Sequence, residues 1–260
     1  MIHINNNEKL DKLKKISNYY VITDFDRTLT SRHSEPSMGI VPKYLGGECL
    51  KERKKIFEYY RPLELDYTIK LEEKQEIMKE WANKSFTLLS KYLTEDIIDK
   101  ALENANIHFR KGAKEFLTKM NNMNIPVIIM SSGVGNILKA FLKKEGCLFE
   151  NIEIVSNFFE FENGKAHIDL NSVMATSNKE YKRIPEDVRN KLEEKDDILL
   201  FGDLIEDIKM ANEEKLSNTI TFGFLDENIE DNLEEFNKNF DIVLTDDDNF
   251  NDVIKILNIN

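Results

Sequence analysis

Short runs of apolar residues recur along the chain, and each ends in a polar residue. Runs of this length, rich in valine and isoleucine, are typical of strands buried on both faces of a parallel sheet. Several are separated by segments with apolar residues at helical spacing, such as 113–123 and 136–144. Strand alternating with helix predicts an α/β fold with a doubly wound, mostly parallel, Rossmann-like sheet. The predicted strands are 20–23, 125–130, 152–155, 198–201, 219–222 and 241–244.

One long segment interrupts this alternation. After the first strand, no further strand is predicted until about residue 125, and the residues between are rich in Lys, Glu, Leu and Tyr. Leu71, Met78 and Trp81 fall at helical spacing, as do residues 88–89. We therefore expect residues 32–108 to form a mostly helical domain, inserted into an α/β core made of residues 1–31 and 109–260.

Composition limits the classes of function. The 260 residues include 36 basic and 48 acidic side chains, which gives a net charge of −12, and 41% of them are hydrophobic. The negative charge disfavours binding to nucleic acid or to an anionic membrane surface. Cys49 and Cys147 match no metal-binding spacing and predict no disulfide framework. Because no apolar stretch resembles a signal peptide or a membrane span, we expect a cytoplasmic protein. The acidic run 246–248 predicts a solvated turn.

Two carboxylates directly follow the first predicted strand. Asp24 and Asp26 stand two residues apart in a segment that ends at Thr28. An aspartate after a strand often caps a helix or begins a turn. However, two carboxylates this close repel each other unless a cation lies between them. In the functional interpretation, Asp24 is a nucleophile and Mg²⁺ ligand, and Asp26 is a general acid directed at a leaving-group oxygen.

Hydroxyl groups follow the second predicted strand. Ser131 and Ser132 precede Gly133 and lead into a predicted helix. Hydroxyls and backbone N–H groups at such a junction can form a phosphate-binding nest. Serine is also a common helix N-cap, and for this motif alone the cap is the more frequent explanation.

A second acidic pair follows the predicted strand 198–201. Asp203 is placed to bind Mg²⁺, and Asp207, one helical turn later, can support it from outside the coordination sphere. A helix cap would explain one such aspartate, but here an acidic pair stands at a second strand end. Ligands in open parallel sheets bind outside the carboxyl ends of the strands, where these motifs are expected to meet.

A lysine is the remaining group that phosphoryl transfer needs. Charge develops on the equatorial phosphate oxygens, and a point cation stabilises it. Lys179, which follows Ser177 and Asn178, is the candidate. Most lysines are solvated surface charges, and this remains the ordinary alternative.

Taken in order, a DxDxT motif, a serine after the next core strand, a lysine and a GDxxxD motif resemble the haloacid-dehalogenase-like phosphatase superfamily. The inserted segment resembles the C1 cap of that superfamily. The chain further resembles the cytosolic pyrimidine (type III) 5′-nucleotidases, from about residue 20 to the C-terminus. The segments that carry this resemblance are 126–136, 155–161, 199–203 and 241–244 and, in the insert, 59–60, 64–66, 72–74 and 78–85.

The resemblance implies a role for each matching residue. Asp24 is implied to be the nucleophile and a metal ligand. Asp26 is implied to be the acid/base group, with its backbone carbonyl on Mg²⁺, and Asp203 the further metal ligand. The other implied roles are phosphate binding by Ser131, Ser132 and Lys179, base recognition by Glu64, a substrate contact from Ser85, and support from Asp207 and Thr28.

We therefore hypothesise Mg²⁺-dependent hydrolysis of nucleoside 5′-monophosphates, with pyrimidine bases implied by the resemblance, through an aspartyl-phosphate on Asp24. The expected partner is a small nucleotide, with no nucleic acid or membrane, and the expected state is a monomer. Phosphoryl transfer to a nucleoside instead of water is a variant of this chemistry. Two alternatives stay open: a sugar-phosphate or phosphoserine phosphatase of the same superfamily, and a catalytically silent binding protein on this fold.

Overall fold

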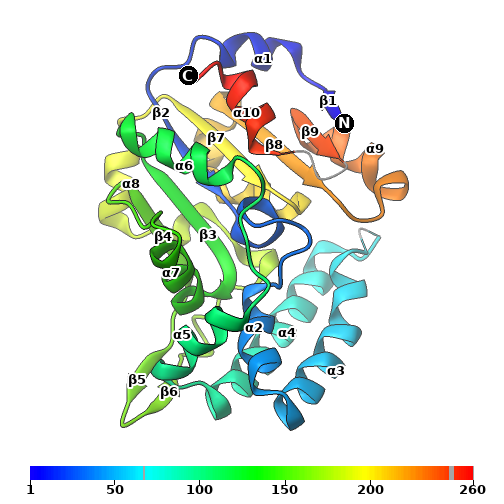
Figure 1. The fold of residues 1–260 in the computed structure, drawn as a ribbon. Coiled ribbons are helices and arrows are strands. Elements are labelled where there is room, and N and C mark those ends of the chain that lie inside the picture. The colour runs from blue at the N-terminus through cyan, green and yellow to red at the C-terminus, as the bar shows by residue number, and fades with distance from the viewer. Residues whose placement is uncertain (67, 246–248, 260) are drawn as a thin grey trace.

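A seven-stranded sheet forms the centre of the computed structural model, which describes residues 1–66, 68–245 and 249–259 (Figure 1). The strand order is β1-β9-β8-β7-β2-β3-β4, and every neighbouring pair is parallel except β1 with β9. The predicted mostly parallel α/β sheet is thereby confirmed. Its strands are β1 (Ile2–Ile4), β2 (Tyr19–Thr23), β3 (Val127–Val134), β4 (Ile152–Asn157), β7 (Asp197–Gly202), β8 (Thr219–Leu225) and β9 (Ile242–Thr245).

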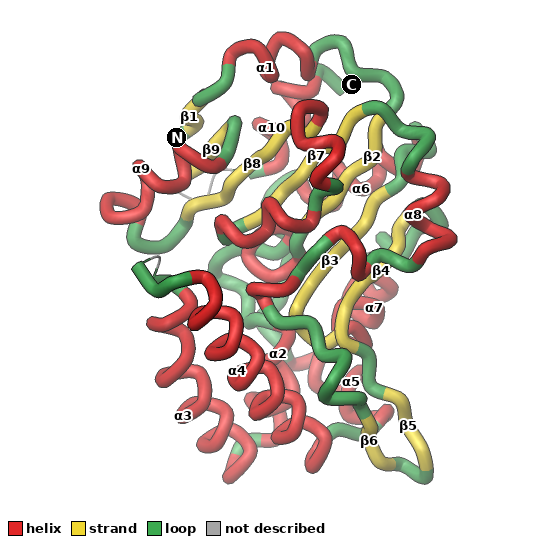
Figure 2. The backbone as a smooth tube through the Cα atoms, turned by 180° about the vertical axis from the view of Figure 1, so that it is seen from behind, coloured by secondary structure: helices red, strands yellow, loops and turns green. Residues whose placement is uncertain are grey.

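Helices cover both faces of the sheet, which explains why its central strands are apolar throughout. Val21 and Leu199 belong to a core shared with α6, α7 and α10, which lie in front of the sheet in Figure 1. Ile22 and Leu200 belong to a second core on the opposite face, closed by α8 and α9, and Figure 2 shows the molecule from that side. These helices, with the N-terminal α1, are α1 (Asn7–Leu13), α6 (Ala113–Asn122), α7 (Gly135–Lys144), α8 (Glu186–Leu192), α9 (Ile229–Asn239) and α10 (Phe250–Leu257).

Four further helices lie between β2 and β3 in sequence and gather at the lower end of the sheet in Figure 1. The helices α3 and α4 pack side by side, and α4 also contacts a hairpin that follows β4. All four fall within the segment predicted as an inserted domain. Their bounds are α2 (Ser37–Leu45), α3 (Gly47–Glu64), α4 (Leu71–Tyr92) and α5 (Glu95–Asn104).

Three short strands were not predicted. The edge strand β1 pairs antiparallel with β9, and β5 (Glu160–Glu162) pairs with β6 (Lys165–His167) in the hairpin that contacts α4. Each has three residues, too few to establish an alternating pattern. The acidic run 246–248, predicted as a turn, lies outside the described residues. Within the described ranges, no helix combines the length and apolar character needed to cross a membrane.

Candidate active site

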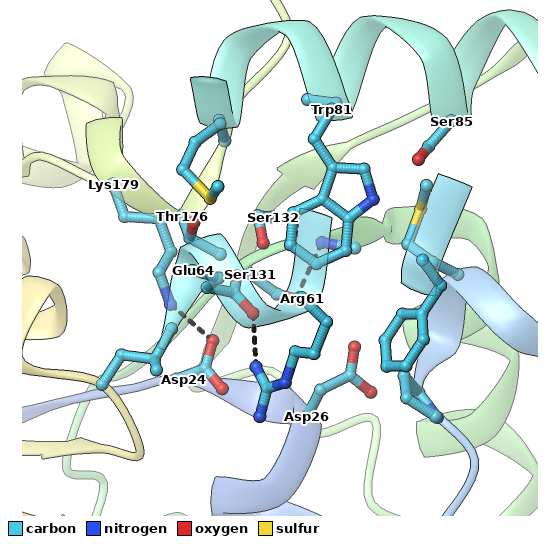
Figure 3. Close-up of a pocket in the computed structure, with 18 of the residues that line it drawn as sticks. Asp24, Asp26, Arg61, Glu64, Trp81, Ser85, Ser131, Ser132, Thr176 and Lys179 are labelled. Carbon is cyan, nitrogen blue, oxygen red and sulfur yellow. Dashed lines mark hydrogen bonds and ion pairs between the residues drawn. The ribbon is translucent and has the colours of Figure 1, made fainter. Parts of the chain in front are cut away.

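A pocket lies between the carboxyl ends of the strands and the helices α3 and α4 (Figure 3). In Figure 3, Asp24 and Asp26 lie on the sheet side, and Trp81 and Ser85 project from α4 on the other side. The pocket brings together residues that are far apart in sequence. The predicted site residues that line it are Asp24, Asp26, Glu64, Ser85, Ser131, Ser132, Lys179 and Asp203. Asp207 and Thr28 are fully buried and do not line it.

Asp24 is fixed where β2 ends. Its backbone N–H donates to the carbonyl of Phe201 on β7 at 2.9 Å, and its side chain is almost fully buried. The chain then turns tightly, with Arg27 in a left-handed conformation at φ +65°, which is uncommon for residues other than glycine. The turn directs Asp24 and Asp26 into the same pocket.

Asp26 is held by the first residue of α2. The backbone N–H of Ser37 donates to Asp26 Oδ1 at 2.9 Å, and Ser37 Oγ donates to Asp26 Oδ2 at 2.7 Å. The N-terminus of a helix carries partial positive charge, which favours a carboxylate there. Both oxygens of Asp26 are thus oriented by a residue that the sequence analysis did not select.

Lys179 lies between two of the aspartates. Its Nζ is 2.7 Å from Asp24 Oδ1 and also forms an ion pair with Asp207 Oδ1. Burial alone would lower the pKa of Lys179, but the carboxylates of Asp207 and Asp24 outweigh it and raise that pKa. The lysine therefore stays charged although only 1% of its surface is exposed.

Asp207 supports the turn that presents Asp203. Its Oδ2 accepts hydrogen bonds from the backbone N–H groups of Asp203 and Leu204, both at 3.1 Å. A Cβ atom on Gly202 would lie 2.4 Å from Asp207 Oδ2, so glycine is required for this approach. Asp207 is thus placed to act through its neighbours, since it does not line the pocket itself.

The serine motif lies inside β3 and not after it. The predicted strand end at residue 130 is wrong: β3 continues to Val134, because these residues still pair with β4 across a register shift between Ser131 and Val134. Ser131 Oγ accepts a hydrogen bond from the N–H of Gly133 at 3.1 Å. Neither serine caps α7, whose N-cap position is Val134. The helix-cap explanation of this motif therefore does not hold.

The helices α3 and α4 supply an aromatic and a carboxylate. Trp81 stacks on Tyr60 with ring centroids 5.9 Å apart and an angle of 8° between the planes. Its side chain lines the pocket, as does the buried Glu64. Ser85 lies one turn further along α4 (Figure 3). This wall offers a flat aromatic surface beside a negative charge, opposite the aspartates.

An ion-pair network links this wall to the sheet. Arg61 pairs with Glu64 on its own helix, and its Nη2 lies 2.8 Å from Glu227 Oε2, in the segment after β8. The other oxygen of Glu227 lies 3.3 Å from Arg27 Nη2 in the turn beside Asp26. Burial opposes it, but the carboxylates of Glu64 and Glu227 raise the pKa of Arg61. Arg61 therefore holds Glu64 in place while connecting α3 to the core.

Electrostatics of the aspartates fit a bound divalent cation. Burial raises the pKa of Asp24 and of Asp203. Repulsion from Asp207 adds to both rises, while Lys179 opposes the rise at Asp24. Among the described residues, no group of three or more His, Cys, Asp and Glu side chains is arranged as a metal site. The set implied by the resemblance needs only two side chains, Asp24 and Asp203, with the backbone carbonyl of Asp26. Carboxylate and carbonyl oxygens are the ligands that Mg²⁺ prefers, so this donor set fits the ion.

Three residues that shape the site were missed by the sequence analysis: Arg53 and Arg61, which line the pocket, and Ser37, which orients Asp26. The two arginines stand eight residues apart on α3, with Phe57 between them, and this spacing places all three on one face of the helix. That spacing was a usable signal. Ser37 had none, because its contact with Asp26 depends on how α2 packs.

Known proteins match nearly the whole chain. The sequence profile described as pyrimidine 5′-nucleotidase (UMPH-1) matches residues 20–259. The chain belongs to the pyrimidine 5′-nucleotidase family. It is therefore an enzyme, a phosphatase of the 5′-nucleotidase class, and the silent-binder alternative falls away.

Curated relatives carry a narrower name. The 7-methylguanosine phosphate-specific 5′-nucleotidase of Drosophila melanogaster is 31% identical over 245 residues, which cover 87% of this chain and 75% of the fly protein. The human protein of the same name is 31% identical over 239 residues, which cover 88% of this chain and 80% of that protein.

Solved structures show the same fold. Cytosolic 5′-nucleotidase IIIB bound to cytidine superimposes with a TM-score of 0.84 at 26% identity, over 99% of this chain and 93% of that one. A phosphoserine phosphatase solved as a phospho-aspartyl intermediate analogue has a TM-score of 0.60 at 17% identity, over 92% and 98%. The second likeness concerns the fold alone and is consistent with a haloacid-dehalogenase-like core.

Proposed function

We propose that the protein hydrolyses pyrimidine nucleoside 5′-monophosphates to nucleoside and phosphate through an aspartyl-phosphate on Asp24. The observation that carries the proposal is the pair formed by Asp24 and Lys179, with Nζ 2.7 Å from Oδ1, at the floor of a pocket whose opposite wall holds Glu64 and Trp81. A nucleophile with an adjacent cation suits the phosphate. An aromatic surface with a carboxylate suits a base.

The reaction takes two steps. In the first, Asp24 attacks phosphorus, the bond from phosphorus to the 5′-oxygen breaks, and Asp26 gives its proton to that oxygen as the nucleoside leaves. In the second, Asp26 takes a proton from water, which attacks the phosphoryl group and frees Asp24 and inorganic phosphate. Burial raises the pKa of Asp26 more than the hydrogen bonds from Ser37 lower it, and the net rise favours the protonated form that the first step needs. Its two hydrogen bonds from Ser37 keep it aimed at the pocket.

Mg²⁺ is the proposed cofactor, held by the carboxylates of Asp24 and Asp203 and the backbone carbonyl of Asp26. When bound, it supplies positive charge that offsets the phosphate and the buried carboxylates. Ser131, Ser132 and Lys179 are proposed to bind the phosphate oxygens, with Asp207 and Thr28 in support. The raised pKa of Asp203, caused by burial and then by repulsion from Asp24, supports a cation at this position.

Base recognition is assigned to Glu64, with Ser85 as a further substrate contact and Trp81 as a stacking surface. A carboxylate accepts hydrogen bonds from the exocyclic amine of cytosine or the ring N–H of uracil. A second candidate is 7-methylguanosine monophosphate, favoured by the stacked Trp81 and Tyr60. Electron-rich rings beside a carboxylate attract the positively charged methylated base.

The domain division at residues 32 and 108 is also a proposal, in which the inserted helices cap the pocket and exclude water during the first step. The acidic surface implied by a net charge of −12 supports a small-molecule substrate with no nucleic-acid or membrane partner. A cytoplasmic location and a monomeric state complete the proposal. The relative named cytosolic 5′-nucleotidase IIIB supports the location.

Phosphate release from a substrate panel tests the function. The purified protein is incubated with CMP, UMP, AMP, 7-methyl-GMP, phosphoserine and p-nitrophenyl phosphate, each with Mg²⁺ and again with EDTA. We expect Mg²⁺-dependent release from CMP or UMP well above AMP. Release mainly from 7-methyl-GMP would select the second candidate. Release from p-nitrophenyl phosphate or phosphoserine alone would reject the nucleotide assignment while keeping the chemistry of Asp24.

A further inference from the structure

Arg53 is a buried cation in the pocket that the proposed reaction does not use. It lies on α3 with only 7% of its surface exposed, and it lines the same pocket as Asp26 and Glu64. Its Nε donates to the carbonyl of Met38 at 3.4 Å, and its guanidinium lies 5.0 Å from the centre of the Phe57 ring. These two contacts fix the position of the side chain at the pocket wall.

No other hydrogen bond of Arg53 is found within the described part of the chain. Its Nη1 is buried and has no hydrogen-bond partner among the described residues, and the guanidinium forms no ion pair with any of them. Arg61, on the same helix face, differs because Glu64 and Glu227 occupy its two Nη groups. A buried guanidinium with free donors is costly unless something binds it. Burial lowers the pKa of Arg53 to about 10, so the group is still charged at neutral pH.

The place of Arg53 indicates which part of a substrate it would meet. Two carboxylates line the pocket together with Arg53, those of Glu64 and Asp26. Both attract the guanidinium. In the proposed function, these are the base-binding group and the acid beside the 5′-oxygen. Arg53 therefore lies within reach of the stretch between base and phosphate. The same two carboxylates disfavour a second anionic group there, so a neutral oxygen is the fitting acceptor.

We propose that Arg53 binds the nucleoside half of the substrate by donating hydrogen bonds to an acceptor oxygen, either a ribose hydroxyl or a carbonyl oxygen of the base. This rests on the proposed nucleotidase function and adds to it a specificity-determining residue. Arg53 would thereby favour nucleotides over other phosphate esters. It takes no part in the proton transfers.

The test is the ratio of kcat/KM for CMP to that for p-nitrophenyl phosphate, measured with Mg²⁺ in the wild type and in Arg53→Met. Methionine keeps an unbranched stem over Phe57 and removes the donors. We expect the ratio to fall by about ten- to a hundredfold, the range for losing a hydrogen bond from a charged group, mainly through a higher KM for CMP. Lys54→Met is the control, because Lys54 is the exposed neighbour on α3 and its ratio should not change.

Comparing CMP with dCMP distinguishes the two possible acceptors of the hydrogen bond, a ribose hydroxyl and a base carbonyl. If wild type prefers CMP to dCMP and Arg53→Met removes that preference, the acceptor is the ribose 2′-hydroxyl. If CMP and dCMP fall together in the variant, the acceptor is elsewhere on the nucleoside, as for a base carbonyl. An unchanged ratio in Arg53→Met, or an equal fall on CMP and p-nitrophenyl phosphate in a folded protein, overturns the proposal.

Folding and function are controlled separately. Arg53→Lys keeps the charge but loses the planar fork, and its ratio should fall by at least about threefold. If Arg53→Met does not fold, a wild-type ratio in Arg53→Lys overturns the proposal. Wild-type protein that releases phosphate from p-nitrophenyl phosphate but from no nucleoside monophosphate would reject the nucleotidase proposal itself, and Arg53 with it. This last outcome is measured on the wild-type protein alone, so it is distinguished from a failure of the Arg53 proposal.

Discussion

At the scale of single residues, the pocket is an arrangement of buried charges that depend on one another. Asp24 is almost fully buried, and Lys179 beside it is more so. An isolated charge in such a place is unfavourable, but the pair is stabilised by mutual attraction and by Asp207. The same burial that would be a cost in a structural core is expected to keep the proposed nucleophile, Asp24, in a fixed orientation.

Asp24→Asn tests the nucleophile. We expect phosphate release to fall by about a thousandfold or more on every substrate, because an amide oxygen cannot form the aspartyl-phosphate. Asparagine has nearly the same shape and can still accept a hydrogen bond from Lys179, so the fold should persist. The check is steady-state release from CMP and p-nitrophenyl phosphate, with circular dichroism to verify folding. A variant with near wild-type turnover would refute the mechanism.

Glu64→Ala tests base recognition. We expect kcat/KM for CMP to fall by about ten- to a hundredfold, because a buried charged acceptor is lost, while release from p-nitrophenyl phosphate falls far less. Arg61 keeps Glu227 as a partner in this variant, so it is not left without a counter-charge. Glu58→Ala, an exposed position on the same helix, is the control. An equal loss on both substrates would remove Glu64 from base recognition.

At the scale of elements, the end of β3 illustrates how a strand is adapted for binding. At the register shift between Ser131 and Val134, the hydroxyl of Ser131 accepts a hydrogen bond from the N–H of Gly133, and Ser131 lines the pocket. Gly133 makes this possible. A Cβ atom there would lie 2.0 Å from Ser37 Oγ and 3.3 Å from Asp26 Oδ2.

Gly133→Ala should therefore damage activity through Asp26. The added methyl displaces Ser37 and with it both hydrogen bonds that orient the Asp26 carboxylate. We expect kcat to fall by about tenfold or more, in line with misplacement of a catalytic group, on nucleotide and p-nitrophenyl phosphate alike. Gly39→Ala is the control, because no atom lies within 4 Å of its added Cβ. Unchanged kcat in Gly133→Ala would show that the Ser37 contact is dispensable.

The elements also show what the sequence can predict and why. Buried parallel strands have a local signature, since every residue from 197 to 202 is buried and most are apolar. The strand ends could therefore be predicted well enough to place the aspartates at the same edge of the sheet. Three-residue strands such as β1 have no such signature. The orientation of Asp26 by Ser37, and of Glu64 by Arg61, depends on helix packing across the pocket. On the sequence, Ser37 is an ordinary polar position. The spacing of Arg61 with Arg53 indicates a shared helix face, but not that Arg61 pairs with Glu64.

At the scale of the molecule, the pocket is less acidic than the chain as a whole, because four basic side chains offset its four carboxylates. The chain has a net charge of −12, yet Arg27, Arg53, Arg61 and Lys179 all line one pocket. Ionic contacts also join the two sides of that pocket. Lys74 on α4 lies 2.8 Å from Glu206, which precedes Asp207, and Arg61 on α3 binds Glu227. We therefore expect substrate binding and the position of α3 and α4 to be coupled through charges.

The pair formed by Lys74 and Glu206 permits a quantitative test of that coupling. The side chains are only 5% and 12% exposed, so their attraction is weakly screened. A double-mutant cycle with Lys74→Met and Glu206→Gln, measured by urea unfolding, should give a coupling free energy of about 1–3 kcal/mol. The costs of the two single changes should add up to more than the cost of the double change, because each single change already removes the whole attraction between the two charges.

The matched control is Lys100 and Asp96 on α5, a pair at 2.7 Å whose side chains are 57% and 65% exposed. Exposed pairs of this kind are screened by water and salt, so this cycle should show no measurable coupling. The contrast separates burial from distance, since both pairs are equally close. If the two cycles gave the same result, α4 would be held against the core by apolar packing, and charges would have no part in closing the pocket.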